Sequence, residues 1–239
     1  MGDAKGRGSL MEFLAEVAAW FGENRSLVVQ RVGEHLTLSG VALAIAIAVG
    51  GPLGLLLGHA RRGAFGAINV ANIGRAVPSL ALMAIAVPFL GIHTGPALVA
   101  LVLLGIPPIL TNTFAGVSQV DADAVEAARG MGMREKEIVL RVELPLAAPV
   151  IVAGIRIAAV QVVATATLAA VIAGGGLGRL IVDGIAVSDE VRVFAGALTV
   201  GALAVATELA LGALERRLVS PGARRSATRA ARAEPIRTA

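Results

Sequence analysis

The longest interval of this chain without Asp, Glu, Lys or Arg runs from residue 76 to residue 120. A helix crosses the roughly 30 Å hydrocarbon core of a bilayer with about 20 apolar residues, so this interval is too long for one crossing. The segment 91–95 (Gly-Ile-His-Thr-Gly) is a natural break near its centre. The interval therefore predicts two membrane spans, near 76–91 and 95–117.

Three further apolar stretches complete the predicted membrane region, at 36–58, 145–173 and 193–214. The last two are interrupted by single charges, Arg156 and Glu208. Hydrophobic residues make up 56% of the chain and charged residues 16%, whereas a soluble domain is about 25% charged. We therefore expect an all-α polytopic membrane protein with about five transmembrane helices. The 29 glycines suit closely packed membrane helices.

The chain divides by composition into three parts. Residues 1–34 are polar and charged, and apolar residues at helical spacing between 10 and 21 predict an amphipathic helix lying on the membrane surface. Residues 35–217 form the predicted transmembrane domain. Residues 218–239 are rich in Arg and Ala, which predicts a disordered tail.

The basic residues gather on one predicted side of the membrane. They lie in the connection after the first span, in the segment 121–144 and in the tail. The positive-inside rule places this side in the cytoplasm. We therefore expect a protein of the cytoplasmic (inner) membrane with its N-terminus outside and its C-terminus in the cytoplasm. The isoelectric point near 10.8 then reflects this bias, and we expect no nucleic-acid partner.

The segment 121–144 (DADAVEAARGMGMREKEIVLRVEL) is the longest predicted cytoplasmic connection between two spans. Asp121 can cap a short helix that ends near Ala128, and Gly130 and Gly132 indicate a turn. A second helix is predicted over 133–142, and Pro145 would lie in the first turn of the next span. The segment therefore predicts a helix–turn–helix that can dock into a groove of a soluble partner.

The same segment carries a recognisable pattern. Glu126-Ala127-Ala128 is followed after three residues by Gly132 and after nine more by Val142-Glu143-Leu144-Pro145. This resembles the E-A-A…G…I-x-L-P signature of the permease subunits of ATP-binding-cassette (ABC) importers, with Val142 in place of Ile. The resemblance implies a type I ABC importer permease fold, in which the segment 121–144 contains a coupling helix. The residues it implies for ATPase coupling are Glu126, Ala127, Ala128, Gly132, Val142, Leu144 and Pro145.

Other segments resemble the osmoprotectant branch of that family. They are AVPSLAL at 76–82, IPPILTNT at 106–113, GIR at 154–156 and AGGGLG at 173–178. Thr111 and Phe114 stand where that branch is expected to carry Arg and Tyr. The implied solute is glycine betaine, choline, carnitine or proline. The alternatives are an ABC importer for another small solute, such as an amino acid, and an ATPase-independent carrier or channel.

The resemblance also implies a set of partners. These are two cytoplasmic ATP-binding subunits, a second permease copy or paralogue, an extracytoplasmic substrate-binding protein and membrane lipid. The sequence contains no G-x-x-x-x-G-K-[ST] phosphate loop, so ATP and Mg²⁺ would be bound by the partner ATPase. We therefore expect a transport subunit that is not itself an enzyme, and no cofactor or metal bound by this chain.

Polar residues inside the predicted spans are candidates for the pore or for contacts between helices. Arg156 and Glu208 lie at comparable depths, so they could form an ion pair across helices or could each extend to the membrane interface. Gln161 and Thr165 share a helix face and could line the pore or bond to a neighbouring helix.

Two further sets of residues have both a structural and a functional interpretation. The prolines of the second and third spans could kink or break those helices; they are Pro78, Pro88, Pro107 and Pro108. Acidic residues in the predicted external loop 174–192 could meet a basic patch on the binding protein or simply face solvent; they are Asp183, Asp189 and Glu190.

Overall fold

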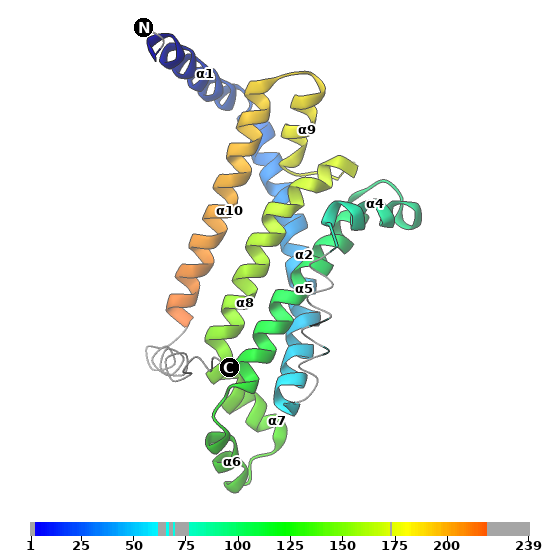
Figure 1. Cartoon of the computed structure of the whole chain (residues 1–239), viewed down its shortest axis with the longest axis vertical. Coiled ribbons are helices and arrows are strands. Elements are labelled where there is room, and N and C mark those ends of the chain that lie inside the picture. The colour runs from blue at the N-terminus through cyan, green and yellow to red at the C-terminus, as the bar shows by residue number, and fades with distance from the viewer. Residues whose placement is uncertain (1–2, 62–65, 67–68, 70–76, 173, 219–239) are drawn as a thin grey trace, which may run out of the picture. The chain divides into compact units, whose positions relative to one another are not determined.

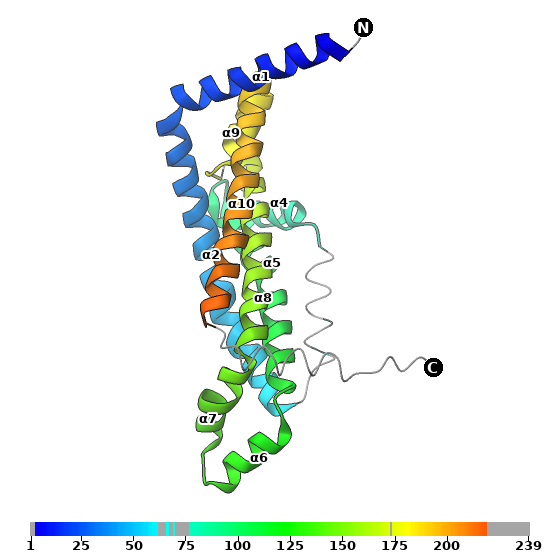
Figure 2. The ribbon, with the colours of Figure 1, turned by 90° about the vertical axis from the view of Figure 1, so that its left-hand side faces the viewer.

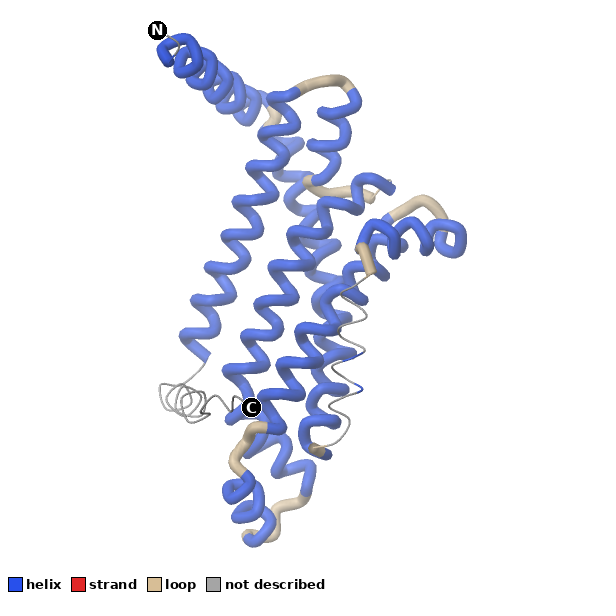
Figure 3. The backbone as a smooth tube through the Cα atoms, in the orientation of Figure 1, coloured by secondary structure: helices blue, strands red, loops and turns tan. Residues whose placement is uncertain are grey.

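The computed structural model describes residues 3–61, 66, 69, 77–172 and 174–218, which are almost entirely helical and include no β-strand (Figures 1 and 3). The predicted tail at 218–239 lies outside these residues apart from its first. The elements are α1 (Asp3–Glu23), α2 (Arg25–Ala60), α4 (Ser79–Leu90), α5 (Thr94–Ser118), α6 (Ala122–Gly130), α7 (Glu135–Ile138), the π-helix η1 (Val139–Glu143), α8 (Leu144–Thr165), the 3₁₀ helix η2 (Ala166–Ile172), α9 (Gly178–Ala186) and α10 (Glu190–Leu218).

Four helical runs among the described residues are long and apolar enough to cross a membrane. They are Arg25–Ala60, Thr94–Ser118, Glu135–Ile172 and Glu190–Arg216, and they contain four of the five predicted spans. The stretch predicted as a span at 76–91 forms α4, whose 12 residues reach only about 18 Å. Pro78 precedes α4 in an extended conformation, and Gly91 ends it at φ +85°. α4 alone is therefore too short to cross the hydrocarbon core.

The prolines of α5 do not break it. The helix continues through Pro107 and Pro108, so of the two predicted alternatives, a kink or a break, the break does not occur. The Thr111 hydroxyl donates to the Pro107 carbonyl at 2.8 Å, and the Asn112 amide donates to the Pro108 carbonyl at 2.8 Å. These bonds satisfy two polar side chains inside an apolar helix.

The chain forms two compact units. The first comprises 1–45, 76–105 and 159–207, and the second comprises 46–75, 106–158 and 208–239. Each of the four long helices contributes residues to both. The core of the first unit consists mainly of small residues, which allow close helix packing. Its members are Ala42, Met83, Ala97, Ala100, Leu101, Val162, Ala166 and Ala169.

Two adjacent residues of α2 hold the glycine-rich connection that follows η2 in the first unit. The Glu34 carboxylate accepts a hydrogen bond from Gly176 N at 2.9 Å. His35 is fully buried, with Nε2 2.8 Å from the Val163 carbonyl and Nδ1 3.4 Å from Leu177 N. This geometry fits an imidazole that donates from Nε2 and accepts at Nδ1. Gly176 has φ +88°, a conformation that favours glycine.

The helix α9 follows this connection and corrects one expectation. The segment 174–192 was predicted to be an external loop, but residues 178–186 are helical. Leu180 and Gly184 on α9 are buried, and a Cβ at Gly184 would lie 2.8 Å from Val193 Cγ2 of α10. Tertiary packing on α10 therefore stabilises a helix that is too short to be recognised by its apolar pattern.

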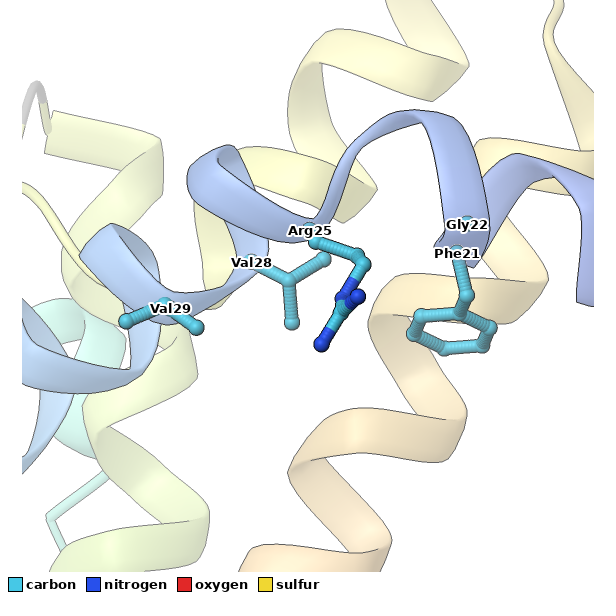
Figure 4. Close-up of a pocket in the computed structure, with 5 residues that line it drawn as sticks. All are labelled: Phe21, Gly22, Arg25, Val28 and Val29. Atoms are coloured by element: carbon cyan, nitrogen blue, oxygen red, sulfur yellow. The ribbon is translucent and has the colours of Figure 1, made fainter.

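The helix α1 includes the predicted amphipathic segment at 10–21 and changes direction at Asn24, before α2 begins (Figure 2). Phe13 of α1 makes an edge-to-face contact with Phe194 of α10, with ring centroids 5.3 Å apart. Beside the turn lies an open cavity of about 370 Å³, where Arg25 extends between Phe21 and Val28 (Figure 4).

In the second unit, α5 packs closely against α2 and α8 through glycines. Gly50, Gly54 and Gly58 form a stripe along α2, and a Cβ at Gly54 would lie 2.7 Å from the Leu110 carbonyl. Gly154 of α8 faces α5 in the same way, since its Cβ would lie 2.8 Å from the Pro108 carbonyl. Small residues let the helix backbones approach within the membrane.

Candidate functional site

The helix α6 begins at a side-chain cap. Asp121 Oδ1 accepts a hydrogen bond from Asp123 N at 2.9 Å, as the sequence predicts for an N-cap aspartate. Val125 and Ala128 are the buried residues of α6. They pack into an apolar cluster whose other buried members are Val117, Val120, Ile138 and Ala147. This packing anchors α6 to the end of α5 and the beginning of the α7–α8 run.

The E-A-A triplet is divided between two faces of α6. Glu126 and Ala127 are exposed, whereas Ala128 is 1% exposed and belongs to the apolar cluster. Ala122 and Asp123 are exposed on α6 as well. The open face of α6 thus includes Ala122, Asp123, Glu126 and Ala127, and two of these four side chains are single methyl groups.

Gly132 forms the turn after α6. It has φ +82°, and its N–H donates to the Arg129 carbonyl at 2.9 Å. Met133 N donates to the Ala128 carbonyl at 3.2 Å, which completes a Schellman motif at the helix C-terminus. No atom lies within 4 Å of a Cβ placed at Gly132, so the backbone conformation, and not crowding, favours glycine here.

The second helical stretch of the loop, predicted over 133–142, begins at Glu135 and is not a single regular α-helix. The α-helix α7 has four residues and runs through the π-helix η1 directly into α8. The N–H of Leu144 donates to the Val139 carbonyl, five residues earlier. Val142 packs against the apolar cluster, and Leu144 and Pro145 lie in the first turn of α8. A π-turn of this kind is frequent at functional sites.

A chain of ionisable side chains connects the loop to the end of α2. Arg129 makes two hydrogen bonds with the Glu135 carboxylate, at 2.8 and 3.0 Å, which raise the pKa of Arg129 above its ordinary value. His59 Nε2 lies 3.2 Å from Glu135 Oε2, and His59 Nδ1 lies 2.8 Å from Glu143 Oε2. Glu143 is 3% exposed.

This chain of contacts was not predicted from the sequence. A carboxylate inside the apolar V-E-L-P motif was a usable signal, because a buried carboxylate requires a partner. The partner itself could not be found from the sequence, since His59 lies 84 residues away from Glu143.

The structure brings Arg156 and Glu208 together and adds a third residue. Arg156 Nε lies 3.3 Å from Glu208 Oε1, and Arg156 Nη1 lies 2.6 Å from Glu215 Oε2. Gln161 and Thr165 lie on α8 in the first unit, and Gln161 Oε1 is buried without a hydrogen-bond partner among the described residues.

The acidic residues of the 174–192 segment are largely held by neighbouring groups. Asp183 forms ion pairs with Arg179 at 3.0 Å and Arg192 at 2.9 Å, and Asp189 accepts from Arg192 N at 2.9 Å. Within the described part of the chain, no group of three His, Asp or Glu side chains is placed to hold a metal ion.

Comparison with known proteins gives a family and close relatives. Residues 50–220 match the family described as binding-protein-dependent transport system inner membrane component. The chain is 42% identical to the carnitine transport permease protein OpuCB of Listeria monocytogenes over 202 residues, which cover 84% of this chain and 93% of that protein. It is 41% identical to the choline transport system permease protein OpuBB of Bacillus subtilis, over 80% of this chain and 88% of that protein.

The fold is also similar to a solved structure. The inward-facing MetNI methionine ABC transporter matches with a TM-score of 0.72 and 23% identity, over 82% of this chain and 98% of that one. This likeness confirms the expected type I importer permease fold. The same family is indicated by the signature in the 121–144 segment, by the four apolar runs and by the relatives. The chain belongs to the binding-protein-dependent transport system inner membrane components, the multi-pass permease subunits of ABC importers.

Proposed function

We propose that this permease forms half of the translocation pathway of an ATP-driven importer for a small quaternary ammonium osmoprotectant, such as choline, carnitine or glycine betaine. The observation that carries this proposal is the identity above 40% to two relatives named for carnitine and choline transport. Both solutes carry a trimethylammonium group. A third relative, 38% identical, is named for glycine betaine, carnitine and choline together.

The assembly in this proposal contains two cytoplasmic ATP-binding subunits, a second permease copy or paralogue and an extracytoplasmic substrate-binding protein. ATP and Mg²⁺ are bound by the ATP-binding subunits, in keeping with the absence of a G-x-x-x-x-G-K-[ST] motif from this sequence. The chain then performs no chemistry and supplies the membrane passage.

The helix α6 is the proposed coupling helix. Its open face, with Glu126 and Ala127, enters a cleft of the ATPase. Val125 and Ala128 hold the opposite face against the end of α5 and the beginning of the α7–α8 run, so a push on α6 reaches both helices. ATP binding favours the outward-facing state because the closed ATPase dimer has a higher affinity for it.

The remaining signature residues support that movement in the proposal. Gly132 permits the turn that closes α6, and Val142 packs beneath the loop. Leu144 and Pro145 begin α8, which carries the movement into the membrane. α6 then lies in the cytoplasm with the C-terminus, and the N-terminus lies outside, in agreement with the number of Lys and Arg residues in the connection after the first span, the 121–144 segment and the tail taken together. This orientation requires a fifth crossing between α2 and α5, which α4 alone is too short to make.

Solute recognition in this proposal belongs to the binding protein. Quaternary ammonium groups are usually held over aromatic faces, and this chain has one Trp, six Phe and no Tyr. The pathway through the permease therefore binds the solute with low affinity. Tight binding of glycine betaine by the permease dimer alone would contradict this part of the proposal.

Transport by the reconstituted complex tests the proposed function. The permease is purified with the ATPase and permease partners that accompany it and is placed in liposomes with the binding protein. We expect uptake of choline, carnitine or glycine betaine that requires ATP and the binding protein, with little uptake of methionine. Uptake that continues without the ATPase subunits would instead support a self-sufficient carrier.

A further inference from the structure

His59 in the last turn of α2 and Arg61, the residue that follows the helix, hold both ends of the loop that carries α6. Arg61 Nη2 donates to the Val120 carbonyl at 2.8 Å, immediately before the cap residue Asp121. His59 Nδ1 lies 2.8 Å from the carboxylate of Glu143, the last residue of η1. We call these contacts of His59 and Arg61 with Glu143 and the Val120 carbonyl the α2 clasp.

The inner contact of the clasp meets a physical requirement. Glu143 is 3% exposed, and a carboxylate this deeply buried is costly unless it is hydrogen-bonded. His59 supplies the hydrogen bond that the structure gives to this carboxylate. The pairing of His59 with Glu143 is therefore firmly held, since separating the two would leave a buried charge unpaired.

The outer contacts extend the clasp to α6. His59 Nε2 reaches Glu135 at 3.2 Å, and Glu135 in turn binds Arg129 on α6 through both carboxylate oxygens. Glu135 and Arg129 are about half exposed, so this pair contributes little to stability. Its geometry nevertheless continues the line of contacts from the coupling helix to the end of α2.

We infer that the α2 clasp makes α2 move together with the loop, so that closure of the ATPase reaches α2 as well as α5 and α8. This inference rests on the proposed function. The glycine stripe already keeps α2 and α5 in backbone contact through Gly58, one residue before His59. The nearest neighbours of the stripe all belong to α5, whereas the clasp links the end of α2 to Glu143, immediately before α8. His59 and Arg61 are thus positioning residues that bind neither ATP nor solute.

The number of solute molecules imported per ATP hydrolysed tests this inference in the reconstituted complex. Arg61→Gln removes the bond to the Val120 carbonyl, and Arg141→Gln is its matched control. Arg141 is an exposed arginine of the same segment with no side-chain bond among the described residues. We expect Arg61→Gln to retain assembly and ATP hydrolysis but to lower solute per ATP about threefold to tenfold, while Arg141→Gln matches the wild type.

His59 provides a second variant with its own controls. His59→Ala should lower solute per ATP at least as much as Arg61→Gln, and His59→Gln, which retains an N–H donor toward Glu143, should recover part of the loss. His93→Ala is the matched control, because His93 is exposed and, within the described part of the chain, bonds only to Gly95 N, two residues away. Arg61→Lys, which retains a donor and the charge, should likewise recover part of the loss.

The outcomes separate the inference from the proposed function. Absence of ATP-driven uptake by the wild-type complex contradicts the proposed function itself. Normal uptake by the wild type, with unchanged solute per ATP in Arg61→Gln and His59→Ala, overturns the inference alone. Loss of assembly in both Arg61→Gln and His59→Gln also overturns it, because the clasp would then be a folding element. If only His59→Ala fails to assemble, the number of solute molecules imported per ATP by Arg61→Gln decides whether the inference holds.

Discussion

Arg156 of α8 and Glu215 of α10 form a close ion pair, with Nη1 2.6 Å from Oε2. Glu208 lies on the same side of α10, since it is two helical turns before Glu215, and reaches Arg156 Nε at 3.3 Å. One guanidinium thus holds two carboxylates on a neighbouring helix. Charged residues within membrane helices generally face protein or water, and this arrangement gives each of the three a partner.

The two carboxylates should contribute unequally to stability. Glu215→Gln should lower the free energy of unfolding by about 1 kcal/mol, because the shorter charge-assisted bond is lost. Glu208→Gln, the matched control, should cost less, since its contact is longer and its side chain is 47% exposed. Thermal unfolding of the full-length permease measures the loss of stability in each of the two variants. An Arg156→Gln background should remove the difference; a difference that persists there would show that Arg156 does not cause it.

The glycine stripe on α2 gives a sharp packing prediction. Gly54→Ala should destabilise the permease by about 1–3 kcal/mol, because the new methyl group would lie 2.7 Å from both the Leu110 carbonyl and Thr113 Cβ. Gly51→Ala is the control on the same helix, since no atom lies within 4 Å of its Cβ. Thermal unfolding should separate the two variants. Equal melting temperatures would contradict the close packing of α2 on α5.

A third prediction concerns the connection held by Glu34 and His35. Gly176→Ala should cost about 1–2 kcal/mol, because φ is +88° and the Cβ would lie 3.1 Å from His35 Nδ1. Gly201→Ala in α10, where nothing lies within 4 Å, should be neutral or slightly stabilising. The melting temperatures of the two variants test this difference in stability. A Gly176→Ala variant as stable as Gly201→Ala would mean that this connection is not fixed as described.

Structural features that depend on a local pattern of residues could be predicted from the sequence alone. Runs without charged residues located the four long apolar helices, and the side chain of Asp121 located the start of α6. Gly132 in the E-A-A signature located the turn, since a positive φ restricts the choice of residue. These features follow from the chemistry of a few neighbouring residues.

Features that depend on distant residues were not predictable in the same way. Residue 35 was placed at the start of the predicted transmembrane domain, but no role for His35 was predicted; it is buried and bonds to the carbonyl of Val163, which lies 128 residues later. Glu215 lies one residue beyond the last predicted span, and its pairing with Arg156 was not predicted. α9 is short, and its packing on α10 is visible only in three dimensions. In each case the partner, and not the local pattern, determines the structure.

The central claim is that α6 is gripped by an ATPase subunit. The chain contains no cysteine, so a single Glu126→Cys variant can be crosslinked specifically to the ATPase in membranes of the assembled importer. Ile185→Cys on α9 is the matched control, because Ile185 is also exposed but belongs to the segment predicted to lie outside. The account predicts a crosslink to the ATPase from position 126, with a yield that changes when ATP binds, and none from position 185. Labelling of position 126 by a membrane-impermeant thiol reagent added outside the cell, or a crosslink from position 185 alone, would contradict it.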